Sequence, residues 1–313
     1  MMLNSTYSHP SVLTLSFGEL SGVKYFYGTL VLICFVLILL FNCTVIMSIA
    51  LHRSLHEAMY IFIVVLCING LYGSVAFLPS LFVNLISKTQ DISYTACLIQ
   101  VFGLHTYGAS EMTILAIMAF DRYVCICNPL RYNTIITLTI VFKLISAAWL
   151  ISIVPVTILI LLTFKLPLCG SLIQKAYCDN WSVVKLSCID TTVNNIYGLF
   201  ITVVLIGITL GLIFVSYLQI LRVCLQSSKR FKAKAVQTCT PHLILLCHFA
   251  LGAISDIILN RLTNFLNFEL RTIISVQGFV IAPLLNPLIY GLKLREIRVR
   301  TGQIFYTKRT LRC

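Results

Sequence analysis

The chain has 313 residues, of which 59% are hydrophobic and only 11% are charged, and its net charge is +13. A soluble domain carries about 25% charged residues, so a water-soluble core cannot hold this much apolar surface. The composition therefore excludes an ordinary soluble protein and favours an all-α membrane protein, in which lipid takes the place of water around the apolar faces.

Seven apolar stretches are long enough to cross a bilayer, because a hydrocarbon core of about 30 Å needs roughly 20 helical residues. A membrane barrel is not expected, because its alternating strands of about ten residues do not occur. His105 and Glu111 interrupt the apolar character of the third stretch, and Gln277 and Asn286 dilute that of the seventh. The predicted spans are 24–51, 58–86, 95–127, 137–163, 191–226, 230–259 and 268–292.

These spans divide the chain into an N-terminal segment (1–23), a membrane domain (24–292) and a tail (293–313). The N-terminal segment lacks the apolar core of a signal peptide, so the first helix is expected to be uncleaved. Of the 23 Lys and Arg residues, 15 fall on one side of the membrane, seven on the other, and Lys143 within the fourth span. The positive-inside rule places the richer side in the cytoplasm and the N-terminus outside. Because this charge is spread over several loops, nucleic-acid binding is not expected.

The predicted outer side carries features of an exposed, oxidising compartment. Asn4 begins an N-glycosylation acceptor, Asn4-Ser5-Thr6, and Asn180-Trp181-Ser182 matches the same pattern close to Cys178. Four of the 13 cysteines lie on this side, where disulfides persist. They allow three pairings, and they lack the paired spacing of a metal site, so no metal is expected there. The four are Cys97, Cys169, Cys178 and Cys188.

Two acidic residues of the third span have distinct expected roles. Glu111 lies deep in the span, where an acid costs a few kcal/mol and is functional by default. It could bind sodium, carry a proton or hydrogen-bond to neighbouring helices. Asp121 stands beside Arg122 at the inner end of the span, where the two can form an ion pair that is held or released.

Several ordered motifs resemble one known family. Asp121-Arg122-Tyr123 ends the third span and Asn286-Pro287-Leu288-Ile289-Tyr290 ends the seventh, as in rhodopsin-like G-protein-coupled receptors. Further runs narrow the resemblance to odorant receptors, over about residues 24–300. These runs are Leu55 to Tyr60, Met118 to Tyr132, Lys185 to Cys188, Lys234 to Cys239 and Pro283 to Pro287. Asn42 in the first span and Trp149 in the fourth belong to the wider resemblance to rhodopsin-like receptors. The run Cys67 to Gly73 is more similar to the fish branch.

The resemblance implies a seven-transmembrane helix bundle with an extracellular N-terminus and a short amphipathic cytoplasmic helix after the seventh span. It implies a multi-pass protein of the plasma membrane, in the cilia of olfactory sensory neurons. Such a protein binds a small-molecule odorant and activates a stimulatory heterotrimeric G protein of the olfactory type, which raises cyclic AMP. It is not an enzyme and needs no cofactor.

The resemblance also implies a switch at the inner end of the bundle. Asp121 and Arg122 of the Asp121-Arg122-Tyr123 motif form the inactive-state latch. We expect Pro287 to break the seventh helix and free a backbone carbonyl that Asn286 satisfies. Tyr217 and Tyr290 are expected to face the same core. A basic cluster opens the sixth helix and could contact the G protein or anionic membrane lipid. The cluster is Lys229, Arg230, Lys232 and Lys234.

The implied ligand site lies between the third, fifth, sixth and seventh helices. Five residues recur at helical spacing on one face of the third span, and Ile257 and Arg261 lie one turn apart in the sixth. Residues 178–181, including Trp181, are expected to cover the pocket, and the implied disulfides are Cys97–Cys178 and Cys169–Cys188. We hypothesise that Arg261 and His105 bind an anionic group such as a carboxylate; alternatively, Arg261 simply ends its helix in water. The five residues on one face of the third span are Leu104, His105, Gly108, Ala109 and Met112.

The chain also departs from the family pattern. Gly70 takes the place of an aspartate in the second span, which puts a sodium site in doubt. Ala250 takes the place of an aromatic residue in the sixth span, which predicts a roomier pocket floor or altered switching.

Two other classes of protein compete with the receptor interpretation. A transporter would show an internal repeat and several charges near the midplane, and only Glu111 and Asp256 qualify as such charges. A membrane enzyme would need a metal cluster, a phosphate loop or a Ser/His/Asp arrangement, none of which the sequence offers.

Overall fold

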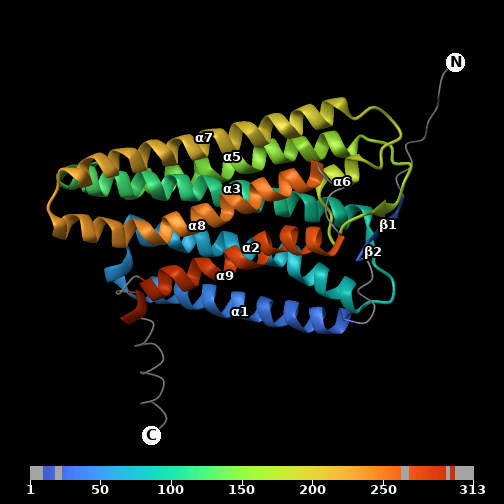
Figure 1. Cartoon of the computed structure of the whole chain (residues 1–313), viewed down its shortest axis with the longest axis horizontal. Coiled ribbons are helices and arrows are strands. Elements are labelled where there is room, and N and C mark those ends of the chain that lie inside the picture. Colours follow the sequence, from blue (N-terminus) through green and yellow to red (C-terminus); the bar gives the residue numbers. More distant parts are fainter. Residues whose placement is uncertain (1–9, 18–22, 262–267, 294–296, 300–313) are drawn as a thin grey trace, which may run out of the picture.

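The computed structural model describes residues 10–17, 23–261, 268–293 and 297–299; the side chains of 256–261 and of several other helical residues also lie outside the description. Within these residues, seven long helices lie side by side (Figure 1). They are α1 (Lys24–Leu51), α2 (Ala58–Ile86), α3 (Tyr94–Cys127), α5 (Leu138–Phe164), α7 (Thr192–Leu225), α8 (Lys229–Arg261) and α9 (Phe268–Lys293).

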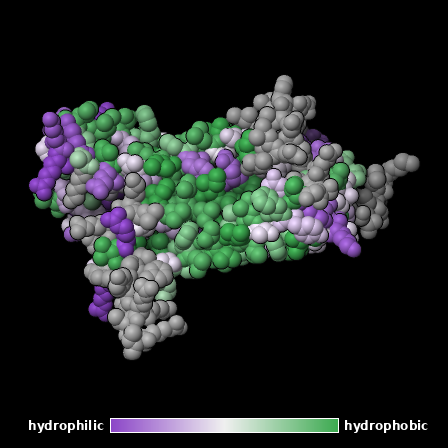
Figure 2. All heavy atoms as spheres, turned by 60° about the horizontal axis from the view of Figure 1, so that its bottom comes forward, coloured by the Kyte–Doolittle hydropathy of each residue, from purple (hydrophilic) through white to green (hydrophobic). Residues whose placement is uncertain are grey.

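These helices confirm the seven predicted spans to within two residues at every end. Six of them are long and apolar enough to cross a membrane, and α3 makes a seventh when joined to the short segment Pro129–Ile135, which is bent from it by 111°. The outer surface of the bundle is mostly hydrophobic between two more hydrophilic ends (Figure 2). The long exposed apolar side chains are therefore the surface that lipid would cover.

The third span is one continuous helix, α3, although His105 and Glu111 interrupt its apolar run. These polar residues do not break the helix, because they find partners without leaving it. His105 Nδ1 lies 2.9 Å from the carbonyl of Val101, one turn earlier, and the Glu111 carboxylate bonds to side chains of α2 and α9.

A small sheet covers one end of the bundle, and the sequence analysis did not predict it. Its strands are β1 (Val12–Leu15), β2 (Asp91–Ser93) and β3 (Leu172–Ile173), in the order β2-β1-β3. β1 pairs antiparallel with β2 and parallel with β3. Leu13 and Leu15 of β1 are buried in the apolar cluster beneath, which anchors the N-terminal segment there. We call this end of the bundle the sheet end.

The opposite end, the latch end, holds the connection between α7 and α8 and three short helices. These are η2 (Arg53–Leu55), η3 (Pro129–Arg131) and α4 (Tyr132–Ile135). α1 begins at the sheet end and α9 finishes at the latch end (Figure 1), as an odd number of crossings requires. That the sheet end is extracellular stays a prediction. The short helix predicted after the seventh span lies mainly outside the described residues. Within residues 294–313 the structure describes only 297–299, and these three are helical.

Candidate functional site

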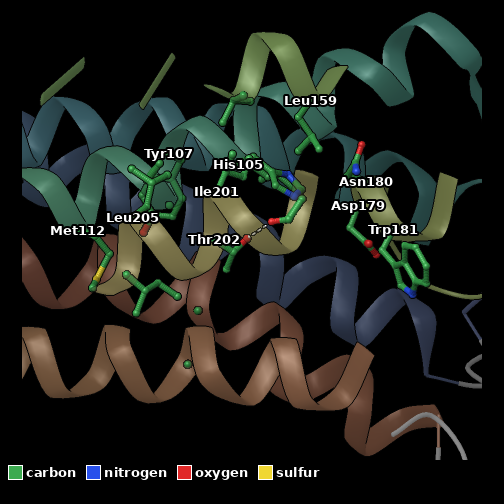
Figure 3. A pocket seen from close by; sticks show the side chains of 18 of the residues that line it. His105, Tyr107, Met112, Leu159, Asp179, Asn180, Trp181, Ile201, Thr202 and Leu205 are labelled. Atoms are coloured by element: carbon green, nitrogen blue, oxygen red, sulfur yellow. Dashed lines mark hydrogen bonds between the residues drawn. The ribbon is translucent and has the colours of Figure 1, made fainter. Parts of the chain in front are cut away.

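A cavity of about 320 Å³ opens within the sheet end of the bundle, in the size range of small-molecule sites. Its walls come from α3, α5, α7, α8, α9 and the loop that contains α6 (Asn180–Val184). Figure 3 shows His105, Tyr107 and Met112 on one wall and Ile201, Thr202 and Leu205 on α7. Most of the lining is apolar, with a few polar groups between.

Six of the predicted ligand-binding residues line this cavity, and the structure thus brings them together. Ile257 and Arg261 are in α8, but their side chains lie outside the described residues, as does Asn4. The six that line the cavity are Leu104, His105, Gly108, Ala109, Met112 and Trp181. Their role in binding a ligand stays a prediction.

The sequence analysis missed the polar wall that α7, α8 and α9 contribute. Asn194, Asn195 and Thr202 come from α7, His248 from α8 and Ser275 from α9. Asparagine, threonine and serine within apolar spans were the available signal, because a polar side chain inside a membrane helix tends to face a cavity or a partner.

Of the two expectations for Ala250, a roomier pocket floor is not supported, and altered switching stays a prediction. Its neighbour Phe249 lines the cavity, while Ala250 does not. The Phe249 ring lies edge-on to the Tyr107 ring, with 6.2 Å between the ring centroids. The aromatic side chain is therefore present one residue earlier than expected, and it packs between α3 and α8.

The cover of the cavity is held by both predicted disulfides. Cys97–Cys178 joins the start of α3 to the loop, with 5.5 Å between the Cα atoms, and Cys169–Cys188 closes the loop on itself at 5.2 Å. In the chain-entropy view each disulfide contributes a few kcal/mol. Asn180 is buried and accepts a hydrogen bond from Thr163, which leaves its surroundings crowded; glycosylation at either acceptor stays a prediction.

Asp179 is the acidic residue of this cover, and it is neutralised locally. Burial raises the pKa of Asp179, but Lys175, whose Nζ lies 2.7 Å from a carboxylate oxygen, and hydrogen bonds from Ser182 lower it by more. The net pKa is below the usual aspartate value. Asp179 is thus ionised at neutral pH, and its charge is matched by Lys175 rather than offered to a ligand.

Below the cavity, Glu111 ties three helices together. Its carboxylate accepts hydrogen bonds of 2.7 Å from Asn69 of α2 and from Asn286 of α9, and its residue is 1% exposed. Of the alternatives for Glu111, the structure shows hydrogen bonding between helices. At Gly70, where the family pattern has an aspartate, the chain lies close to Pro283 and Asn42.

The predicted role of Asn286 as the partner of a carbonyl freed by Pro287 is wrong. α9 continues through both Pro283 and Pro287 to Lys293. The carbonyl one turn before Pro287 is that of Pro283, and Asn42 of α1 donates to it at 2.9 Å. The donor that Pro287 cannot supply to this carbonyl therefore comes from a neighbouring helix, α1. Asn286 donates to Glu111 instead.

The latch end holds the predicted ion pair. Arg122 donates to one carboxylate oxygen of Asp121 through Nε, at 3.0 Å, and through Nη2. Tyr132 of α4 donates to the other oxygen at 2.7 Å. Asp121 and Arg122 are buried, and Tyr123 beside them is half-buried against the neighbouring apolar cluster. We call Asp121, Arg122 and Tyr132 the latch; the sequence analysis gave Tyr132 no role.

If the latch restrains signalling, as the family resemblance implies, Tyr132→Phe is expected to raise basal signalling, because it removes one hydrogen bond to a buried carboxylate. Such a bond is worth about 1.5–3 kcal/mol, enough to release the latch in roughly tenfold more molecules if it is made only in the closed state. Agonist-free cyclic AMP measured at matched surface expression tests this. Basal activity equal to that of the unchanged receptor would show that Tyr132 does not hold the latch.

Two tyrosines assigned to the switch are placed differently from each other. Tyr217 of α7 hydrogen-bonds to His242 Nδ1 at 2.6 Å, and His242 Nε2 lies 2.9 Å from the carbonyl of Leu115 in α3. His242 thus links α8 to α3 and α7. Tyr290 is buried at the latch end, and its hydroxyl has no hydrogen-bond partner among the atoms that the structure describes.

Comparison with known proteins agrees with this architecture. A family model described as olfactory receptor matches residues 30–308. Human olfactory receptor 52K1 is 32% identical over 310 residues, covering 97% of this chain and 98% of that protein. Human olfactory receptor 51E1 is 35% identical over 85% of this chain and 84% of its own, and mouse olfactory receptor 51E2 is 32% identical over 97% and 96%. The similarity to the fish branch stays a prediction. The chain belongs to the olfactory receptor family, a family of multi-pass plasma-membrane receptors for small odorants rather than of enzymes.

Proposed function

We propose that an odorant binds in the cavity at the sheet end and that this end is extracellular. Binding shifts the bundle toward a state in which the latch end is open to a stimulatory heterotrimeric G protein of the olfactory type, and cyclic AMP rises. Segment 1–23 is then extracellular, residues 293–313 form the cytoplasmic tail, and the expected site is the cilia of olfactory neurons.

One observation carries this proposal: a single unbroken helix, α3, bears one wall of the cavity, Glu111, and the Asp121 and Arg122 of the latch. Met112, on the cavity wall, is ten residues from Arg122, which is about 15 Å along the helix axis. Glu111, next to Met112, bonds to α2 and α9. A ligand shifts an equilibrium only between states that it binds with different affinity. A ligand that prefers one position of α3 would therefore bias both the Glu111 contacts and the latch.

Cyclic AMP measured in cells that express the chain tests the proposal. A panel of amino acids, short acids, amines, steroids, ketones and alcohols is expected to contain at least one agonist. A response of the same size in cells that express an Arg122→Ala receptor would contradict it. Solute flux into liposomes that contain the purified chain, without ligand-dependent cyclic AMP, would instead favour a transporter.

The basic residues at the start of α8 are proposed to serve this coupling and to contact anionic lipid. Arg230 and Lys229 are exposed, as expected for either partner. Near a surface of anionic lipid each such charge is worth about 1 kcal/mol.

Arg261→Ala is expected to lower the potency of an acidic odorant such as octanoate about tenfold, because a guanidinium offers a carboxylate a charged fork. The potency of the neutral ketone 2-octanone should not change. Arg261 is nine residues beyond Gly252 of the cavity wall, about 13 Å along the helix, so it would contact only the outer end of a ligand. Full potency of the best acidic odorant at the Arg261→Ala receptor would dispose of this role.

A further inference from the structure

The cavity walls that the structure describes carry almost no available charge. Asp179 is the only Asp, Glu, Lys or Arg among them, and its carboxylate is bound by Lys175 and Ser182. A cationic ligand group would therefore be desolvated in the cavity without a free counter-charge, which is costly. This argues against an ammonium group in the ligand.

Three polar atoms on the walls are buried without a hydrogen-bond partner in the part of the chain that the structure describes: Nδ2 of Asn194, the hydroxyl of Tyr107 and Nε2 of His248. Asn194 is 6% exposed and Tyr107 is 1% exposed, whereas His248 as a residue is half-buried. Two further polar side chains of the lining already have partners: the Thr202 hydroxyl donates to the carbonyl of Gly198 at 2.7 Å, and Asn180 accepts from Thr163. Buried donors are rarely left unpaired, so a missing partner points to a bound group.

We propose that Asn194 is the polar anchor of the site and that it donates a hydrogen bond to an acceptor oxygen of the ligand. This inference rests on the proposed function and deepens it. The ligand class is a mainly apolar molecule with one such oxygen, as a carbonyl, a hydroxyl or a carboxylate. The apolar part lies against Leu104, Met112 and Leu205, and the Tyr107 hydroxyl is a second donor for the same class of ligand.

Binding is tested without signalling, on the purified full-length receptor, by the rise in melting temperature that a bound ligand causes. The probes share an eight-carbon chain: 2-octanone, 1-octanol, octanoate and octylamine. In the expected order of affinity, the three oxygen-bearing probes bind more tightly than octylamine. Asn194→Leu keeps a side chain of similar size but has no donor, so it should weaken the binding of 2-octanone and of octanoate alike, by roughly tenfold. Asn194→Asp should reverse the order in favour of octylamine. Arg261→Ala distinguishes an anionic ligand from a neutral one, because only the binding of octanoate should become weaker.

Thr192→Val is the matched control. It removes an exposed hydroxyl two residues from Asn194 and outside the cavity lining, and it should leave the binding of 2-octanone unchanged. The proposal is overturned if 2-octanone gives no shift, if octylamine binds best, or if Asn194→Leu binds 2-octanone as tightly as the unchanged receptor. Binding in the expected order without any rise in cyclic AMP would leave the anchor standing and contradict the proposed function instead.

Discussion

Arg122→Ala is expected to abolish odorant-evoked cyclic AMP while the receptor still reaches the cell surface. In the structure Arg122 is buried and is bound to Asp121 through two of its nitrogens. A buried pair of this kind can have two discrete arrangements, closed on Asp121 or released toward a partner. Without the guanidinium the closed latch cannot form, and the proposed contact of Arg122 with a G protein is lost.

Stability has to be separated from signalling in this experiment, because removing one partner of a buried ion pair costs about 3–5 kcal/mol. Arg122→Lys keeps a positive charge beside Asp121 and lacks the planar fork, so it should fold better and still signal poorly. Arg53→Ala removes an exposed arginine at the same end and should signal normally. Surface labelling and cyclic AMP are measured together, and intact signalling by Arg122→Ala would refute the assignment.

Gly73→Ala is expected to destabilise the receptor and to distort the ligand cavity. A Cβ atom at Gly73 of α2 would lie 2.5 Å from Cγ and 2.9 Å from Cε2 of the Tyr107 ring. The ring is buried and packed against Phe249 and Phe279, so it cannot move aside freely. Overpacking of this kind costs about 1–3 kcal/mol. Because Tyr107 lines the cavity, ligand potency should fall as well.

The matched control for this substitution is Gly207→Ala. Gly207 lies in α7 with no atom within 4 Å of the added methyl group, and the helix should gain up to about 1 kcal/mol from the better propensity of alanine. The melting temperature of the purified receptor should therefore fall for Gly73→Ala and hold or rise for Gly207→Ala. Equal melting temperatures for the two variants would mean that α2 and α3 do not approach as closely as described.

Much of the fold follows from the sequence, because the bilayer fixes how many apolar residues a crossing helix needs. α1, α2 and α5 could be placed by length alone. The residues of the α3 cavity wall followed from helical spacing, which puts Leu104, Gly108 and Met112 on one face. The two disulfide pairings did not follow from spacing, and only the family resemblance selected them.

The contacts that the sequence could not supply join residues far apart in the chain. Glu111 and Asn286 are separated by 175 residues, and Asn42 and Pro283 by 241. Nothing in the local pattern tells which acceptor an asparagine will meet, so Asn286 was assigned to the wrong one. The sheet was missed because strands of two to four residues leave no periodic pattern, and the error at Ala250 was a shift of one residue.

The central claim is that a ligand in the sheet-end cavity opens a latch at the other end of the same helix. The most direct measurement is odorant-evoked cyclic AMP in the unchanged receptor, an Asn194→Leu receptor and an Arg122→Ala receptor, at matched surface expression. The account predicts that Asn194→Leu shifts the concentration of 2-octanone needed for a half-maximal response about tenfold, whereas Arg122→Ala removes the response at every concentration. Two variants that both retain the concentration dependence of the unchanged receptor would contradict it.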